Sequence, residues 1–168
     1  MEKQHALQRL EQLQKKLYAI HYACSAMNLD ADTVAPKNTS EGRGVALGVL
    51  AGEEQQLMIC PETRALLDEL DRQKDELDLL HRREVEELRR RCDQLTRIPA
   101  EEYIAYSELV NKAGDVWHKA KEKDDFAMFC PLLQELVEYN RKFAAYYDST
   151  RAPYDALLNE YERGVDTK

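Results

Sequence analysis

Acidic and histidine side chains recur in this sequence at a spacing that metal-binding helices use. An acid followed three residues later by a histidine lies with it on one helix face, so both side chains can reach one ion. Four-helix proteins with di-iron or di-manganese centres carry such pairs on two helices. The sequence contains three pairs: Glu2 and His5, Asp78 and His81, Asp115 and His118. A di-metal centre is therefore one hypothesis for this chain.

The alternative is that each histidine lies on the flank of a helix and is satisfied by its neighbouring acid. We favour this alternative, because the first pair lies at the terminus and the other two use Asp in place of the longer Glu. The additional Glu ligands of such centres cannot be singled out among 32 acidic residues. We therefore assign no catalytic residue, no cofactor-binding residue and no metal ligand in this chain.

Other catalytic motifs are absent from the 168 residues: there is no His-Glu-x-x-His, no Gly-x-Ser-x-Gly and no phosphate-binding glycine loop. The four cysteines, Cys24, Cys60, Cys92 and Cys130, are too widely separated for a clustered zinc site. Because they lie among apolar residues, we expect buried, reduced thiols in a cytoplasmic protein.

The charge of the chain argues against two classes of partner. A formal net charge of −8 is unsuited to nucleic acid and to an anionic membrane surface, since both attract clustered Lys and Arg. No apolar run has the length of a membrane span, about 18 residues, and the first residues lack an apolar signal core. The length and the 43% hydrophobic content predict one globular domain over residues 1–168.

Apolar residues at spacings of three and four predict an all-α fold, an antiparallel bundle of about six helices with no β-sheet. Helices are expected at about 2–27, 41–58 and 62–97, on both sides of Asp124 and Asp125, and at 153–161. The first helix has an apolar stripe of Leu10, Leu13, Leu17, Ile20, Cys24 and Met27, which Tyr18 and Tyr22 are expected to widen. Residues 28–39 are expected to form a loop, with Ser40 capping the next helix. The five prolines should mark helix boundaries, with Pro131 in a first helical turn and Gly164 ending the last helix.

Residues 101–164 hold the only Trp and all three Phe, so we expect them to organise the fold. Asp124 and Asp125 are suited to capping the second helix of this stretch. Trp117 is expected to anchor the core rather than to bind a ligand. The two predicted apolar faces are Tyr103, Tyr106, Val110, Ala113, Trp117 and Ala120, and Leu133, Leu136, Val137, Asn140, Ala144 and Tyr147.

Two further patterns predict packing surfaces. Gly44, Gly48 and Gly52 share a helix face, which favours close approach of another helix, with room for a ligand as the alternative. Residues 62–97 form one long charged helix or two helices meeting near residues 72–75. Their narrow apolar seam could pair within the chain or with a second copy; it comprises Leu70, Leu77, His81, Val85, Leu88, Cys92 and Leu95.

An ordered set of residues resembles the N-terminal third of the carboxypeptidase Taq family of zinc-dependent metallocarboxypeptidases. Asp30, Asp32-Thr33 and Pro36 are similar to that family's Trp-Asp-x-x-Thr-x-x-Pro loop, and Arg97-Ile98-Pro99 to its basic–apolar–Pro step. The later matching residues are Trp117, Ala120, Asp125-Phe126, Phe129, Pro131-Leu132, Tyr154 to Leu158, Glu160 to Glu162, and Gly164. The sequence departs from the family at Leu29, Lys121 and Arg163, where Trp, Arg and Pro are usual.

The resemblance implies a largely helical enzyme, often a homodimer, that removes C-terminal amino acids from peptides. It also implies a zinc site formed by a His-Glu-x-x-His helix and a Glu that lie well beyond the point matching Lys168. We therefore expect an N-terminal helical domain whose partner is the remainder of a metallopeptidase chain, as a fragment or a truncated paralogue. Alone it is expected to be inactive. The alternatives are a freestanding helical interaction or dimerisation module built on residues 62–97, and the di-metal bundle.

Overall fold

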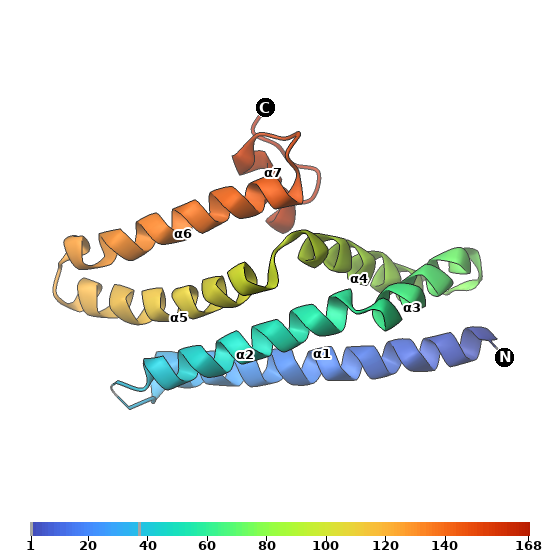
Figure 1. The fold of residues 1–168 in the computed structure, drawn as a ribbon, viewed down its shortest axis with the longest axis horizontal. Coiled ribbons are helices and arrows are strands. Elements are labelled where there is room, and N and C mark those ends of the chain that lie inside the picture. The colour runs from blue at the N-terminus through green and yellow to red at the C-terminus, as the bar shows by residue number, and fades with distance from the viewer. Residues whose placement is uncertain (1, 37) are drawn as a thin grey trace. The chain divides into compact units, whose positions relative to one another are not determined.

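The computed structural model describes the backbone of residues 2–36 and 38–168 and the side chains of residues 3–36 and 38–168. Among the described residues there are helices and no β-strand, which confirms the all-α prediction (Figure 1). The elements are α1 (Glu2–Thr33), α2 (Ser40–Ile59), α3 (Pro61–Arg72), the 3₁₀ turn η1 (Lys74–Glu76), α4 (Leu79–Arg97), α5 (Ala100–Glu122), α6 (Phe126–Tyr147) and α7 (Pro153–Tyr161).

The chain forms two compact units, and α2 contributes to both. The first unit comprises Met1–Pro36 and Val49–Thr96, and the second comprises Lys37–Gly48 and Arg97–Lys168. The expectation of one domain over residues 1–168 stays a prediction.

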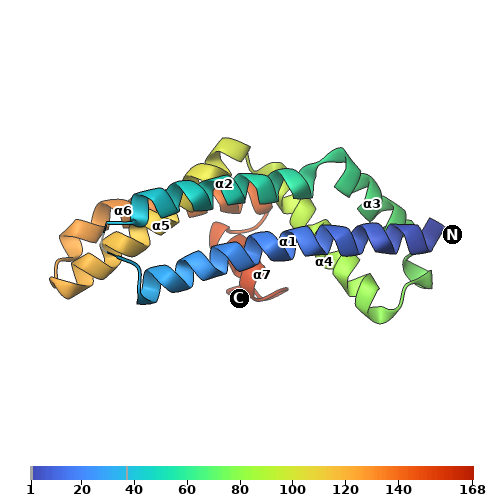
Figure 2. The same ribbon diagram turned by 90° about the horizontal axis from the view of Figure 1, so that it is seen from below.

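The first unit is built on α1, which packs against α3 (Figure 2). Leu10, Leu13 and Leu17 are buried in the predicted stripe. At the border of the contact, the Arg9 guanidinium lies 3.4 Å from the Glu69 carboxylate. Tyr18 and Tyr22 were expected to widen the buried stripe, but they are 69% and 65% exposed. Their rings stack on each other at a centroid distance of 6.1 Å instead.

Helix α1 runs six residues further than predicted, to Thr33. The turn-forming residues after Met27 predicted a loop, but backbone bonds continue through them. The Thr33 hydroxyl donates to the Leu29 carbonyl at 2.6 Å, and the amides of Val34 and Ala35 both donate to the Asp30 carbonyl. Such i−4 and i−5 bonds satisfy the last carbonyls of a helix, so this end tolerates residues of low helix propensity.

Residues 62–97 form two helices rather than one, and the change of direction falls at η1. The apolar seam is used inside the chain: Leu70, Leu77, Val85, Cys92 and Leu95 are all buried. At one border of this packing, the Gln55 amide, itself buried, donates to the Leu95 carbonyl at 3.1 Å. The seam residues therefore serve packing within the chain.

In the second unit, α5 and α6 form an antiparallel hairpin (Figure 1). The chain reverses at Asp124, whose φ of 51° lies in the left-handed region. The Asp125 amide donates to the Ala120 carbonyl at 2.9 Å, which closes the end of α5. The Asp125 side chain accepts from the Met128 amide at 3.2 Å, so the predicted cap of α6 is confirmed at this residue.

Pro131 was expected in the first turn of its helix, but α6 begins at Phe126 and places Pro131 in the second turn. Because proline has no N–H, the Ala127 carbonyl receives no bond from position 131. The other four prolines lie outside helix interiors: Pro36 follows α1, Pro61 and Pro153 begin α3 and α7, and Pro99 precedes α5.

The contact between α5 and α6 buries Leu109, Ala113 and Leu132, with Val116, Phe129, Leu136 and Tyr139 packed around them. The predicted faces were partly wrong, because Val110, Trp117 and Val137 are 46%, 43% and 42% exposed. The buried residues of α5 are Leu109, Ala113 and Ala120, and the partly buried Val116 continues the same series. The predicted face of this helix shares only Ala113 and Ala120 with the observed one. These two positions lie where the predicted face and the observed face overlap.

Helix α2 approaches α5 along the predicted glycine face. A Cβ at Gly44 would lie 3.0 Å from the Asn111 side-chain nitrogen, and one at Gly48 would lie 2.8 Å from the Glu108 carboxylate. Close helix packing is therefore confirmed for these two glycines. Gly42, two residues before Gly44, has no atom of the described residues within 4 Å of its Cβ position.

We expect Gly48→Leu to lower the free energy of unfolding by about 1–3 kcal/mol, the range for overpacking a filled contact. Denaturant unfolding followed by circular dichroism measures this change. Gly42→Leu is the matched control, since its side chain enters open space on the same helix. Equal stability of the two variants would show that α2 does not pack closely on α5 at this point.

Candidate functional site

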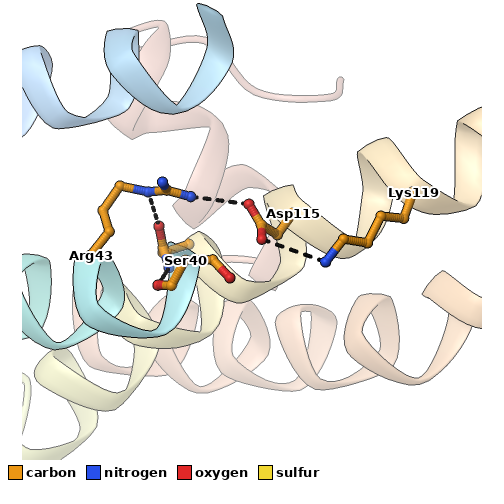
Figure 3. Close-up of polar contacts among 5 residues, drawn as sticks. Ser40, Arg43, Asp115 and Lys119 are labelled. Atoms are coloured by element: carbon orange, nitrogen blue, oxygen red, sulfur yellow. Dashed lines mark hydrogen bonds and ion pairs between the residues drawn. The ribbon is translucent and has the colours of Figure 1, made fainter. Parts of the chain in front are cut away.

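A polar network around Arg43 joins α2 to α5 (Figure 3). The Arg43 guanidinium donates to the Asn111 side-chain oxygen at 2.9 Å and to the Asp115 carboxylate at 3.0 Å. The Asn111 amide donates in turn to the Ser40 carbonyl at 2.9 Å, in the first turn of α2. Lys119 lies one turn beyond Asp115, with its ammonium 3.8 Å from the other carboxylate oxygen.

Burial distinguishes the members of this network. The Arg43 side chain is only 9% exposed and that of Asp115 is 26% exposed, whereas Lys119 is 54% exposed. A guanidinium removed from water needs an anionic partner, because its charge is costly to bury unpaired. Asp115 supplies that charge, and Asn111 fixes the direction of the guanidinium. Sequence reasoning missed Arg43, although its position beside the glycine face of α2 was a usable signal.

The three acid–histidine pairs have different surroundings. The His81 ring lies 2.7 Å from the Asp78 carboxylate, and the His81 amide also donates to it, so Asp78 caps α4. Asp115 binds Arg43 and Lys119 in the second unit. The side chain of Glu2 lies outside the described residues. No group of three His, Cys, Asp or Glu suited to a metal ion occurs in the part of the chain that the structure describes.

The same contacts determine the acidity of Asp78. The backbone amide of His81, followed by the His81 side chain, holds the pKa of the Asp78 carboxyl below its usual value. This is the pattern expected when hydrogen bonds stabilise the ionised form of an N-cap residue. The pair therefore performs a capping role at the start of α4.

The four cysteines are free thiols with different exposures. Cys92 is buried, Cys24 and Cys60 are half-buried, and Cys130 is exposed, so the expectation of four core thiols was wrong at Cys130. Burial raises the pKa of both Cys24 and Cys92, with the Glu54 carboxylate adding to the effect at Cys24. Thiols with raised pKa values are poor nucleophiles, which fits a packing role for these two.

The residues that carried the family resemblance have contacts that build the fold. Arg97 donates to the Tyr147 carbonyl at the end of α6, Ile98 is buried, and Pro99 occupies the N-cap position of α5. Ala156 is buried in α7, and Gly164 has a φ of 76°, which favours glycine. At the departure Lys121, the ammonium lies 4.9 Å from the centre of the Trp117 ring, in a cation–π contact with the indole.

The fold and its contacts define a helical scaffold, and comparison with known proteins identifies the family. Residues 9–168 match the family described as carboxypeptidase Taq (M32) metallopeptidase. The chain belongs to this family and corresponds to its N-terminal region.

Two curated relatives support the assignment. Carboxypeptidase 1 of Bacillus subtilis is 36% identical over 150 residues, which are 88% of this chain and 30% of the relative. Thermostable carboxypeptidase 1 of Pyrococcus furiosus is 31% identical over 154 residues, which are 92% of this chain and 31% of the relative. The chain thus spans about a third of the length of the curated relatives it matches.

Solved structures agree with this assignment. The crystal structure of BsuCP superposes with a TM-score of 0.93 at 32% identity, over 97% of this chain and 33% of that one. Metallocarboxypeptidase 1 of Trypanosoma cruzi gives a TM-score of 0.74 at 30% identity, over the same shares. None of the described helices is long and apolar enough to cross a membrane.

We expect Asp115→Ala to lower the free energy of unfolding by about 1–3 kcal/mol, because it leaves the Arg43 charge without its anionic partner. Lys119→Ala is the control, since an exposed ion pair contributes about 1 kcal/mol or less. Denaturant unfolding of both variants measures the difference. An equal, small effect of the two substitutions would show that the Arg43–Asp115 pair does not stabilise the fold.

The lowered pKa of Asp78 predicts a pH dependence of stability. A carboxyl whose pKa is depressed by folding stabilises the protein above its unfolded pKa, and this contribution is lost as the pH falls through the folded pKa. Asp78→Asn should therefore reduce the decline in stability between about pH 5 and pH 2. Urea midpoints measured across this range test the expectation. Asp93→Asn, at an exposed acid of the same helix, should keep the decline of the parent chain.

Proposed function

We propose that this chain forms the N-terminal helical part of a carboxypeptidase that removes C-terminal amino acids from peptides. The match over residues 9–168, with a TM-score of 0.93 to BsuCP, carries the proposal. The metal of the full-length enzyme would be zinc, as the family resemblance implies. The described residues do not offer a three-ligand site for it, so its ligands would come from polypeptide beyond the matched region.

The role proposed for this chain is structural support of the catalytic part. Its principal partner would be the remainder of the metallopeptidase polypeptide, with a second copy of the enzyme as a further partner. Neither nucleic acid nor membrane lipid is proposed as a partner, given the net charge of −8. A cytoplasmic location is proposed from the four free thiols, since reducing compartments keep cysteines in this state.

A chimera tests this function. Residues 1–168 of this chain replace the matching N-terminal region of Bacillus subtilis carboxypeptidase 1, and release of C-terminal amino acids from a peptide is measured. We expect the chimera to be active, to lose activity on chelation and to regain it with zinc. The 168-residue chain alone should release nothing, because it lacks the His-Glu-x-x-His motif.

The intact Bacillus enzyme and the same enzyme without its N-terminal region serve as controls. A chimera that folds but releases no amino acid contradicts the proposal, as does peptide hydrolysis by the 168-residue chain alone. The gene sequence after the Lys168 codon gives an independent check. A His-Glu-x-x-His motif in the same reading frame supports the proposal, and an immediate stop codon contradicts the idea that the natural polypeptide contains its own catalytic part.

A further inference from the structure

Helix α5 has three sides, and two of them pack within the second unit. Leu109 and Ala113 belong to the side that contacts α6. Glu108, Asn111 and Asp115 belong to the side that contacts α2. The third side carries Val110, Gly114 and Trp117, which are spaced by four and three residues and so share one face.

This third side is apolar and open. Val110 is 46% exposed and Trp117, the only tryptophan, is 43% exposed. A Cβ at Gly114 would have no atom of the described residues within 4 Å. An ordinary solvated helix face carries polar and charged residues, whereas here the Lys121 ammonium lies over the Trp117 ring.

The glycine between the two large side chains is not explained by packing within the chain. Gly44 and Gly48 are met closely by α5 side chains, so a larger residue there would displace them. Gly114 has open space, and glycine in a helix interior is unfavourable relative to alanine. A bare backbone position flanked by Val110 and Trp117 suits the close approach of another helix.

We propose that this face, Val110–Gly114–Trp117, docks a helix of the catalytic polypeptide that follows this region in full-length carboxypeptidases. The inference rests on the proposed function. The occupant is argued from length, because the chain covers 33% of BsuCP while matching its fold over 97% of its own residues. Two thirds of such an enzyme therefore lies outside the described fold and is available to cover this face.

The size of the face argues against a second copy as the occupant. A stable dimer buries roughly 800 Å² on each partner, and the two side chains of Val110 and Trp117 with the bare backbone of Gly114 supply only part of that. A segment of the same polypeptide needs less area, because its docking does not lose the translational freedom of a separate molecule.

The test compares the effect of Gly114→Leu on the melting temperature in two backgrounds, the 168-residue chain and the chimera with Bacillus subtilis carboxypeptidase 1. In the chain alone, the new side chain enters open space and replaces a helix-breaking glycine, so Tm should rise by about 2–4 °C. In the chimera it should fall, because leucine would occupy the place of the docked helix. Gly42→Leu is the control and should shift Tm in the same direction in both backgrounds.

Val110→Lys provides a second variant in case Gly114→Leu prevents folding of the chimera. It should leave the Tm of the chain unchanged and lower that of the chimera. An active chimera whose Tm rises with Gly114→Leu overturns the docking face and leaves the proposed function standing. An inactive chimera overturns both. A lower Tm of Gly114→Leu in the chain alone would show that another part of the same chain already packs on this face. A dimer of the chain that Gly114→Leu dissociates in sedimentation would assign the face to a second copy. Either result overturns the inference.

Discussion

Two different kinds of contact hold α5, and the second unit depends on both. Towards α6 the contact is apolar, with Leu109, Ala113 and Leu132 at its centre. Such burial supplies most of the stabilisation but constrains the register of two helices only weakly. Towards α2 the contact is directional, because Arg43 must meet both Asn111 and Asp115. The combination gives α5 one rotational setting.

That setting determines what α5 presents on its remaining side. With one face on α6 and another on α2, Val110, Gly114 and Trp117 are left in the open. A rotation of about 100°, one residue along the helix, would turn these three residues towards α6 and move Asp115 away from Arg43. The pair formed by Arg43 and Asp115 opposes that rotation, since it would separate a mostly buried guanidinium from its anion. The polar network therefore matters for the outer surface as well as for the core.

Membership of a peptidase family without the catalytic motif has a simple physical meaning here. The residues that carry the match start helices, close them or fill the spaces between them, as Pro99, Asp125 and Ile98 do. These roles depend on backbone geometry and packing, so the matched residues need no catalytic chemistry to be recognisable. The Arg43 network was not found in the sequence for a related reason: its members come from residues about 70 positions apart, and no local spacing marks them as partners.

The sequence by itself determined the helical class, the position of most helices and several of their ends. These features arise from interactions between residues a few positions apart, such as the Asp125 cap, the Pro153 start and the stripe of Leu10, Leu13 and Leu17. Only the tertiary structure decided which side of α5 is buried. The apolar residues of α5 spread around more than one face, so periodicity admits several orientations, and the partners at α2 and α6 select one of them. For the same reason the exposure of Trp117, Tyr18 and Cys130 could not be predicted, because burial depends on what distant parts of the chain place against a side chain.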